Sequence, residues 1–253
     1  MSESTVISFV CLLARVSAFI GFVPLFGRRQ VPVMVKAGLA LALTVFWWDS
    51  MPSAKQSEGS HAFAYALMLG REIGIGLLLA MLVGLLLVPA RIAGSYIGQE
   101  IGVSMDPVTN AGFDQSTIVA MIFETFAVLL FFGLNLHHFM ILFVHHSFAS
   151  LQSLSFTELP TEDLVALTGK LPEFGLLIMA PVGVMAFVVL VALFLLSKAA
   201  PTLNLFSVGM PLRVGLGVLS LFIFLPVLWT SIEAYFYRMI GELEQFMGYF
   251  ANG

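Results

Sequence analysis

Charged residues are scarce in this chain of 253 residues, since Asp, Glu, Lys and Arg together make up only 10% of it. A soluble globular protein usually has about 25% charged residues, so this composition excludes that class. The hydrophobic fraction is 59% and the mean hydropathy is +1.00. No polar stretch is long enough for a second soluble domain. We therefore expect a single integral-membrane unit that comprises residues 1–253.

Cysteine and basic clusters are also nearly absent. Cys11 is the only cysteine, which excludes an internal disulfide and favours a small buried packing residue. The net charge of −4 includes no long basic run, which argues against nucleic acid as a partner. Residues 1–5 lack the positive charge of a signal peptide, so we interpret the first apolar segment as retained in the protein.

Motifs for catalysis and cofactor binding are missing as well. The sequence contains no Gly-x-Ser-x-Gly, no phosphate-binding Walker loop and no dinucleotide fingerprint. Histidines occur as the pairs His137-His138 and His145-His146, and a continuous helix would place His138 and His145 on one face. Interfacial histidines are favoured over a metal site, because no acidic or cysteine ligand is placed beside them. We predict a protein that is not an enzyme and that uses no cofactor or metal.

Long apolar stretches dominate the rest of the sequence. With a spanning length of about 20 residues, about six helical segments are predicted, at residues 6–26, 33–48, 62–89, 118–144, 174–197 and 214–232. Four prolines lie within or at the ends of these segments, namely Pro24, Pro89, Pro181 and Pro226. Each removes a helical hydrogen bond, so we expect an all-α membrane protein of kinked helical hairpins. Residues 198–213, which contain two prolines, are expected to form a re-entrant or interfacial hairpin.

Small residues recur at every fourth position in two places. These positions are Ala90, Gly94, Gly98 and Gly102 in one stretch, and Gly70 and Gly74 in another. On a helix, this spacing gives a continuous stripe that lets backbones pack closely where no water drives association. We predict helix-packing contacts at these positions, within a tightly packed helical assembly.

The longer stripe leads into a stretch that cannot be a membrane span. Its residues are Ser104, Met105, Asp106, Pro107, Val108, Thr109, Asn110, Ala111, Gly112 and Phe113. Long apolar segments lie on both sides of it. An irregular loop between membrane segments persists only where it is buried in protein or lines a wet cavity. We therefore expect this loop to lie in a pathway.

Three ionisable residues are predicted to lie at membrane depth: Arg15, Glu100 and Glu124. Such charges are costly, and they either carry function or face protein or a cavity. For Arg15, burial against a carboxylate or a helix end of a partner subunit is favoured. Glu124 is expected to pair with an arginine or to face a wet interior, and Glu100 to point into a lumen or at a neighbouring subunit. Glu72 is interpreted as an interfacial anchor.

Four short stretches, in the same order as in a known family, are spread along most of the chain. They are residues 24–32 with 36–41, 97–107, 135–138 near 147–148, and 200–211. Together they resemble the FliR family of flagellar biosynthetic membrane proteins and their type III secretion counterparts. The third stretch departs from the family pattern, because Leu136 stands where the family usually has a glycine. The Asp106-Pro107 and Asn204-Leu205-Phe206 stretches look more like the flagellar branch.

The resemblance implies a structural and gating subunit of a protein-export channel in the bacterial inner membrane, at the flagellar basal body. It implies FliP-like and FliQ-like subunits in one hetero-oligomeric helical core, FlhB-like and FlhA-like export proteins as neighbours, membrane lipid around it, and unfolded protein substrates inside it. It assigns residues 104–116 as a plug in the closed channel. One alternative is the equivalent subunit of a virulence type III secretion system. Another is a small-molecule or ion transporter, which broken helices with intramembrane charges also favour.

Overall fold

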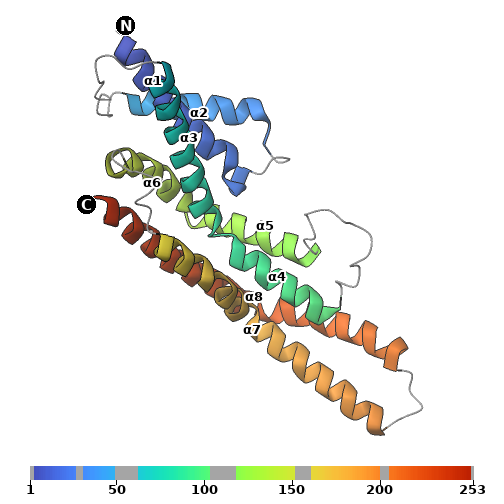
Figure 1. The fold of residues 1–253 in the computed structure, drawn as a ribbon. Coiled ribbons are helices and arrows are strands. Elements are labelled where there is room, and N and C mark those ends of the chain that lie inside the picture. Colours follow the sequence, from blue (N-terminus) through green and yellow to red (C-terminus); the bar gives the residue numbers. More distant parts are fainter. Residues whose placement is uncertain are drawn as a thin grey trace. The chain divides into compact units, whose positions relative to one another are not determined.

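A computed structural model describes residues 3–26, 31–48, 62–102, 118–151, 161–199 and 205–251, and every element in these ranges is helical (Figure 1). The elements are α1 (Glu3–Phe22), η1 (Pro24–Phe26), α2 (Val33–Trp47), α3 (Ala62–Gly84), α4 (Val88–Ile101), α5 (Ile118–Gly133), α6 (Leu136–Ser150), α7 (Thr161–Ala199) and α8 (Leu205–Ala251). The predicted all-α fold is confirmed.

Two of the predicted apolar segments each contain a helix break. The segment at 62–89 divides into α3 and α4, and Pro89 lies in the first turn of α4, where its missing N–H leaves no hydrogen bond unmade. The segment at 118–144 divides into α5 and α6 at Asn135, whose φ is 59°. A left-handed residue of this kind ends a helix. About six predicted segments thus become eight α-helices in the described ranges.

Prolines inside the two longest helices do not end them. Pro172 and Pro181 lie within α7, and Pro211 and Pro226 lie within α8. Residues 198–199 and 205–213 of the predicted hairpin are helical, and residues 200–204 lie outside the described ranges, so its re-entrant or interfacial position stays a prediction. The long apolar flanks favour a helix at these prolines, because in an apolar environment the backbone groups on both sides of a proline must still be paired, and a helix pairs them.

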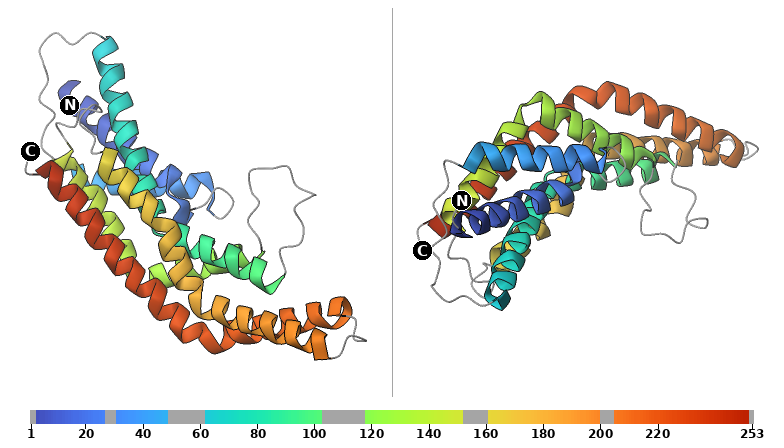
Figure 2. Two further views of the ribbon diagram at one scale, coloured as in Figure 1. Left: turned by 60° about the horizontal axis from the view of Figure 1, so that its bottom comes forward. Right: turned by 90° about the horizontal axis from the view of Figure 1, so that it is seen from above.

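The chain divides into two compact units. Unit 1 comprises Met1–Leu85, Leu136–Leu159 and Glu242–Gly253, and unit 2 comprises Leu86–Asn135 and Pro160–Gly241. Within unit 1, α1 packs along α3, and Figure 2 shows this pair from two further directions. A Cβ atom built on Gly76 of α3 would lie 2.4 Å from the carbonyl oxygen of Arg15 on α1. The two backbones are therefore in direct contact.

Unit 2 is organised around α4, and three helices approach it closely at glycines. A Cβ built on Gly94 of α4 would lie 2.7 Å from Cα of Ala120 on α5. One built on Gly175 of α7 would lie 2.5 Å from Cγ2 of Ile92, and one on Gly217 of α8 would lie 2.5 Å from Cγ1 of Ile101. Each contact requires a residue without a side chain, so α4 is tightly held by α5, α7 and α8.

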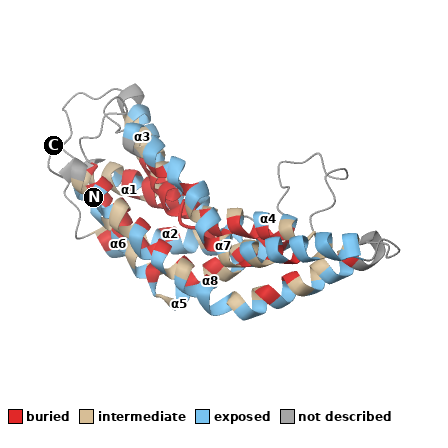
Figure 3. Cartoon of the chain, turned by 90° about the horizontal axis from the view of Figure 1, so that it is seen from below, coloured by how far each residue is buried: buried red, intermediate tan, exposed pale blue. Residues whose placement is uncertain are grey.

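By length and composition, the described residues contain four helices able to cross a membrane, or up to five if α5 and α6 together form one broken span. The four stretches are Thr5–Phe22, Tyr65–Gly84, Leu164–Ala199 and Gly209–Gly248. In an 18-residue apolar section of each stretch, only 22% of the third and 17% of the fourth is buried within the chain, and exposed residues run along α7 and α8 in Figure 3. Most of the apolar surface of these two helices is left for lipid or other proteins.

Candidate functional site

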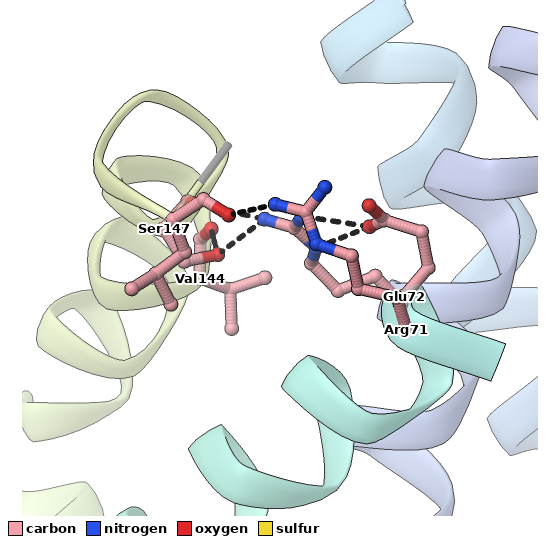
Figure 4. A network of polar contacts seen from close by, with 6 residues as sticks. Arg71, Glu72, Val144 and Ser147 are labelled. Atoms are coloured by element: carbon pink, nitrogen blue, oxygen red, sulfur yellow. Dashed lines mark hydrogen bonds and ion pairs between the residues drawn. The ribbon is translucent and has the colours of Figure 1, made fainter. Parts of the chain in front are cut away.

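A buried arginine, Arg15, links three helices of unit 1. Figure 4 shows the polar network to which it belongs, with Arg71, Glu72 and Ser147 labelled. Arg15 of α1 has a side chain only 2% exposed, and its Nε and Nη2 atoms each lie 2.7 Å from Oε2 of Glu72 on α3. Its Nη1 donates hydrogen bonds to the Ser147 carbonyl oxygen at 2.8 Å and to the Ser147 hydroxyl at 3.2 Å. Ser147 lies in the last turn of α6, so one guanidinium contacts α1, α3 and α6.

A second arginine binds the same end of α6. Nη2 of Arg71 donates to the carbonyl oxygen of Leu151 at 3.0 Å, directly after the last residue of α6. The final carbonyls of a helix lack intrahelical partners and carry a partial negative charge. The Arg15 guanidinium also lies 4.4 Å from the centre of the Phe148 ring, a cation–π contact. We call Arg15, Arg71, Glu72, Ser147 and Leu151 the Arg15 network.

The carboxylate and the helix end that the sequence predicted for Arg15 both come from the same chain. Sequence reasoning placed them on a partner subunit and interpreted Glu72 as an interfacial anchor. In the structure, Glu72 neutralises a buried cation and is itself only 12% exposed. The arrangement holds charge at fixed positions between helices.

Two ion pairs hold the ends of α4 in unit 2. Arg91 in its first turn donates to both carboxylate oxygens of Glu124 on α5, from Nε at 3.0 Å and from Nη2 at 2.5 Å. At the other end, Arg213 of α8 donates from Nε to the Glu100 carbonyl oxygen, and its Nη2 lies 3.5 Å from the Glu100 carboxylate. Glu124 therefore has an arginine partner, which is one of the two environments expected for it.

The predicted packing residues of α4 lie on its buried face. Ala90, Gly94 and Gly98 are buried, and Gly102 ends the helix with a φ of 85°. In α3, a Cβ on Gly70 would meet no atom within 4 Å, and Gly74 is half-buried. The predicted loop, Ser104 to Phe113, lies outside the described residues, so its place in a pathway stays a prediction.

Several contacts escaped sequence reasoning. Gly76, Gly175 and Gly217 make close contacts with neighbouring helices but stand outside the four-residue stripes, and Arg213 was not singled out. The available signal was an isolated glycine within an apolar helical run, since such a residue costs helix stability and usually has a packing reason. The histidines make ring contacts, and the ring centres of His145 and Trp47 are 5.7 Å apart. In the ranges that the structure describes, no three potential metal ligands cluster.

Comparison with known proteins agrees with this architecture. Residues 6–239 match the family model described as bacterial export proteins, family 1. The chain is 29% identical over 252 residues to the flagellar biosynthetic protein FliR of Bacillus subtilis (strain 168), covering 95% of this chain and 94% of the relative. It is 30% identical over 239 residues to FliR of Escherichia coli (strain K12), covering 91% and 89% respectively.

A similarity to a second branch is weaker and slightly shorter. Yop proteins translocation protein T of Yersinia pestis is 22% identical over 228 residues, covering 88% of this chain and 87% of the relative. The family model covers most of the chain, and the relatives match it nearly end to end. The protein belongs to the bacterial export proteins, family 1, the FliR family, and is a membrane component of a type III protein-export apparatus.

Proposed function

We propose that this chain is a structural and gating subunit of the flagellar type III export channel in the bacterial inner membrane. It acts as one subunit formed by residues 1–253, together with FliP-like and FliQ-like subunits, and with FlhB-like and FlhA-like proteins as neighbours. Unfolded substrates pass through the assembly, and the chain itself catalyses no reaction. Relatives named flagellar biosynthetic proteins support the flagellar branch over the virulence branch.

The apolar length of α7 is the observation that carries the proposal. Its apolar window, Leu164–Ala199, has 36 residues, which at 1.5 Å per residue is about 54 Å. The hydrocarbon core of a bilayer is about 30 Å thick, so about 24 Å of this helix would extend beyond it at small tilt. Only 22% of an 18-residue section of this stretch is buried within the chain. Apolar helices of partner subunits would cover the excess.

The exposed side chains of α7 suit such partners. They are large and apolar, and they include Val184, Phe187, Val188, Phe194 and Leu195. An apolar surface that continues past the reach of lipid marks a protein–protein interface. Assembly with other apolar helices would therefore remove the exposed apolar surface of α7 from water.

The helices that flank the loop at 104–116 support a plug role for it. Gly94 of α4 packs on the backbone of Ala120 of α5, and Arg91 pairs with Glu124 between the same helices. The last residue of α4 packs on Gly217 of α8. Two helices held this firmly on either side of a loop suit a plug role, because they fix the points where the loop begins and ends.

We expect co-expression with the FliP-like and FliQ-like proteins of the same genome to give one discrete complex containing all three, measured by native mass spectrometry. Phe187→Glu should abolish that complex, because it puts a charge on the exposed face of α7. Glu162→Lys, in the first turn of α7 outside the apolar window, is the matched control and should assemble normally. A chain that stays alone, folded and monodisperse would contradict the proposal and favour the transporter alternative.

Shortening the loop tests the gating role separately. Deleting residues 106–112 should let ions leak through the assembled complex in liposomes, because the plug no longer fills the closed channel. An equal deletion at 51–57, in the polar link before α3, should leave the membrane tight. A complex that assembles and stays tight without 106–112 would rule out the plug while leaving the structural role intact. A transporter would instead bind or move a solute as the isolated chain.

A further inference from the structure

The hairpin of α1 and α2 in unit 1 contains an open groove. At one end, the rings of Phe9 and Trp48 meet edge to face at 5.5 Å. Towards the other end, where α1 finishes and α2 begins, the helices leave a groove of about 500 Å³. Its lining residues are Ser17 and Gly21 of α1 and Val33, Lys36, Ala37 and Ala40 of α2. Its volume falls in the range of about 300–1,000 Å³ typical of ligand pockets.

Small side chains create this space. A Cβ atom built on Gly21 would meet no atom within 4 Å, so this part of the groove is not filled by the described residues. On α2, positions 33, 36, 37 and 40 follow the spacing of one helix face, and Ala37 and Ala40 provide only methyl groups. The result is a channel between two helices with apolar walls.

Among the described residues that line the groove, the polar chemistry is that of one cation. Ser17 donates its hydroxyl proton to the Ala14 carbonyl oxygen at 3.1 Å, so this hydroxyl has no proton left for a ligand. Within this described lining, Lys36 alone is charged and no residue has a carboxylate. A groove with apolar walls and one ammonium group matches an amphiphile with an apolar chain and an anionic head.

The surroundings of the groove favour a lipid as this amphiphile. Outside the groove, α2 also exposes large apolar side chains, with Met34 and Phe46 exposed by 88% and 77%. Its 15 residues extend about 22 Å, which is short of the bilayer core of about 30 Å. A lysine near the start of such a helix reaches the headgroup level, and basic pockets between membrane helices bind anionic headgroups.

We propose that the α1–α2 groove binds one anionic phospholipid. Its phosphate accepts hydrogen bonds from Nζ of Lys36, and an acyl chain follows the wall formed by Gly21, Ala37 and Ala40. The bound lipid fills the part of the bilayer core that the short helix α2 does not reach. This site concerns one hairpin of unit 1 and is independent of the export-gate role proposed above.

The role of the Lys36 charge is tested by adding defined lipids to the purified complex that contains this chain. Native mass spectrometry then measures which lipids are retained. The wild type should retain one phosphatidylglycerol about fivefold more strongly than phosphatidylcholine, the effect expected of one lysine near an anionic headgroup. Lys36→Gln should remove this preference, and Lys36→Arg should keep it. Inorganic phosphate at millimolar concentration should not displace the lipid.

The groove itself is tested by filling it. Ala37→Phe should prevent retention of either lipid, because its ring occupies the acyl-chain path. Val35→Phe lies about 200° round the helix from Ala37 and is the matched control that should bind normally. Circular dichroism and complex formation verify that each variant is folded, which separates failure of this site from failure of the export-gate proposal.

Three results would overturn the inference. The first is equal retention of the two lipids by the wild type. The second is a preference for phosphatidylglycerol that persists in Lys36→Gln, or lipid retention that persists in Ala37→Phe. Either result would mean that the lipid binds elsewhere, for example on the outer face of the assembly, with a partner helix filling the groove. The third is displacement by inorganic phosphate, which would make Lys36 a simple anion site.

Discussion

Glu72→Leu is expected to destabilise the protein by about 3–5 kcal/mol, because the variant leaves a buried arginine without its countercharge. The Arg15 side chain is 2% exposed, so water cannot replace the lost carboxylate. Its remaining hydrogen bonds to Ser147 satisfy one nitrogen and supply no negative charge beyond the partial charge of the α6 end. Chemical unfolding in detergent micelles, followed by tryptophan fluorescence, measures the change.

A double-mutant cycle separates the pair from the burial of each partner. Arg15→Leu combined with Glu72→Leu should recover much of the loss, because the double variant contains no unpaired buried charge. Arg91→Gln and Glu124→Gln form the matched cycle at a pair whose side chains are 52% and 23% exposed, and its coupling energy should stay below about 1 kcal/mol. Equal coupling in the two cycles would show that burial does not set the strength of the Arg15 pair.

Hydrophobic runs predicted where three of the helices begin. The predicted segments at 33, 62 and 118 start at the first residues of α2, α3 and α5, whereas those at 6, 174 and 214 start inside α1 (Glu3–Phe22), α7 (Thr161–Ala199) and α8 (Leu205–Ala251). The break at Asn135 was missed because it depends on one residue with a positive φ inside an otherwise apolar run. Composition signals a membrane helix well, since the cost of unpaired backbone groups in lipid applies to every residue of the run.

The partners of the charged residues could not be predicted from the sequence. Glu72 lies 57 positions from Arg15, and Ser147 lies 132 positions away. Nothing in the local pattern around Arg15 distinguishes a carboxylate on α3 from one on another subunit, because both satisfy the same requirement for a countercharge. The helix-packing glycines were limited in the same way. A four-residue spacing identifies a small face, but the place where another backbone crosses that face depends on the tertiary fold.

Gly76→Ala tests that distinction, and we expect it to destabilise the protein by about 2–3 kcal/mol. The added methyl group would lie 2.4 Å from the Arg15 carbonyl oxygen and 2.9 Å from Cβ of Ala18. A backbone carbonyl within a helix cannot turn away as a flexible side chain can, so α1 as a whole must shift from α3. Thermal unfolding of the purified chain measures the loss.

Gly70→Ala, on the same helix, is the matched control with the opposite expected sign. A Cβ there meets no atom within 4 Å, and alanine is preferred to glycine inside a helix by about 0.5–1 kcal/mol, so this variant should be neutral or slightly more stable. The two substitutions add the same methyl group to α3, and only the approach of α1 differs.

Because Gly76 contacts the carbonyl of the residue that carries the buried charge, a shift of α1 also pulls the Arg15 guanidinium from Glu72. Gly76→Ala and Glu72→Leu should therefore cost less together than the sum of their separate effects. Strict additivity would mean that the glycine contact and the Arg15 network stabilise α1 independently.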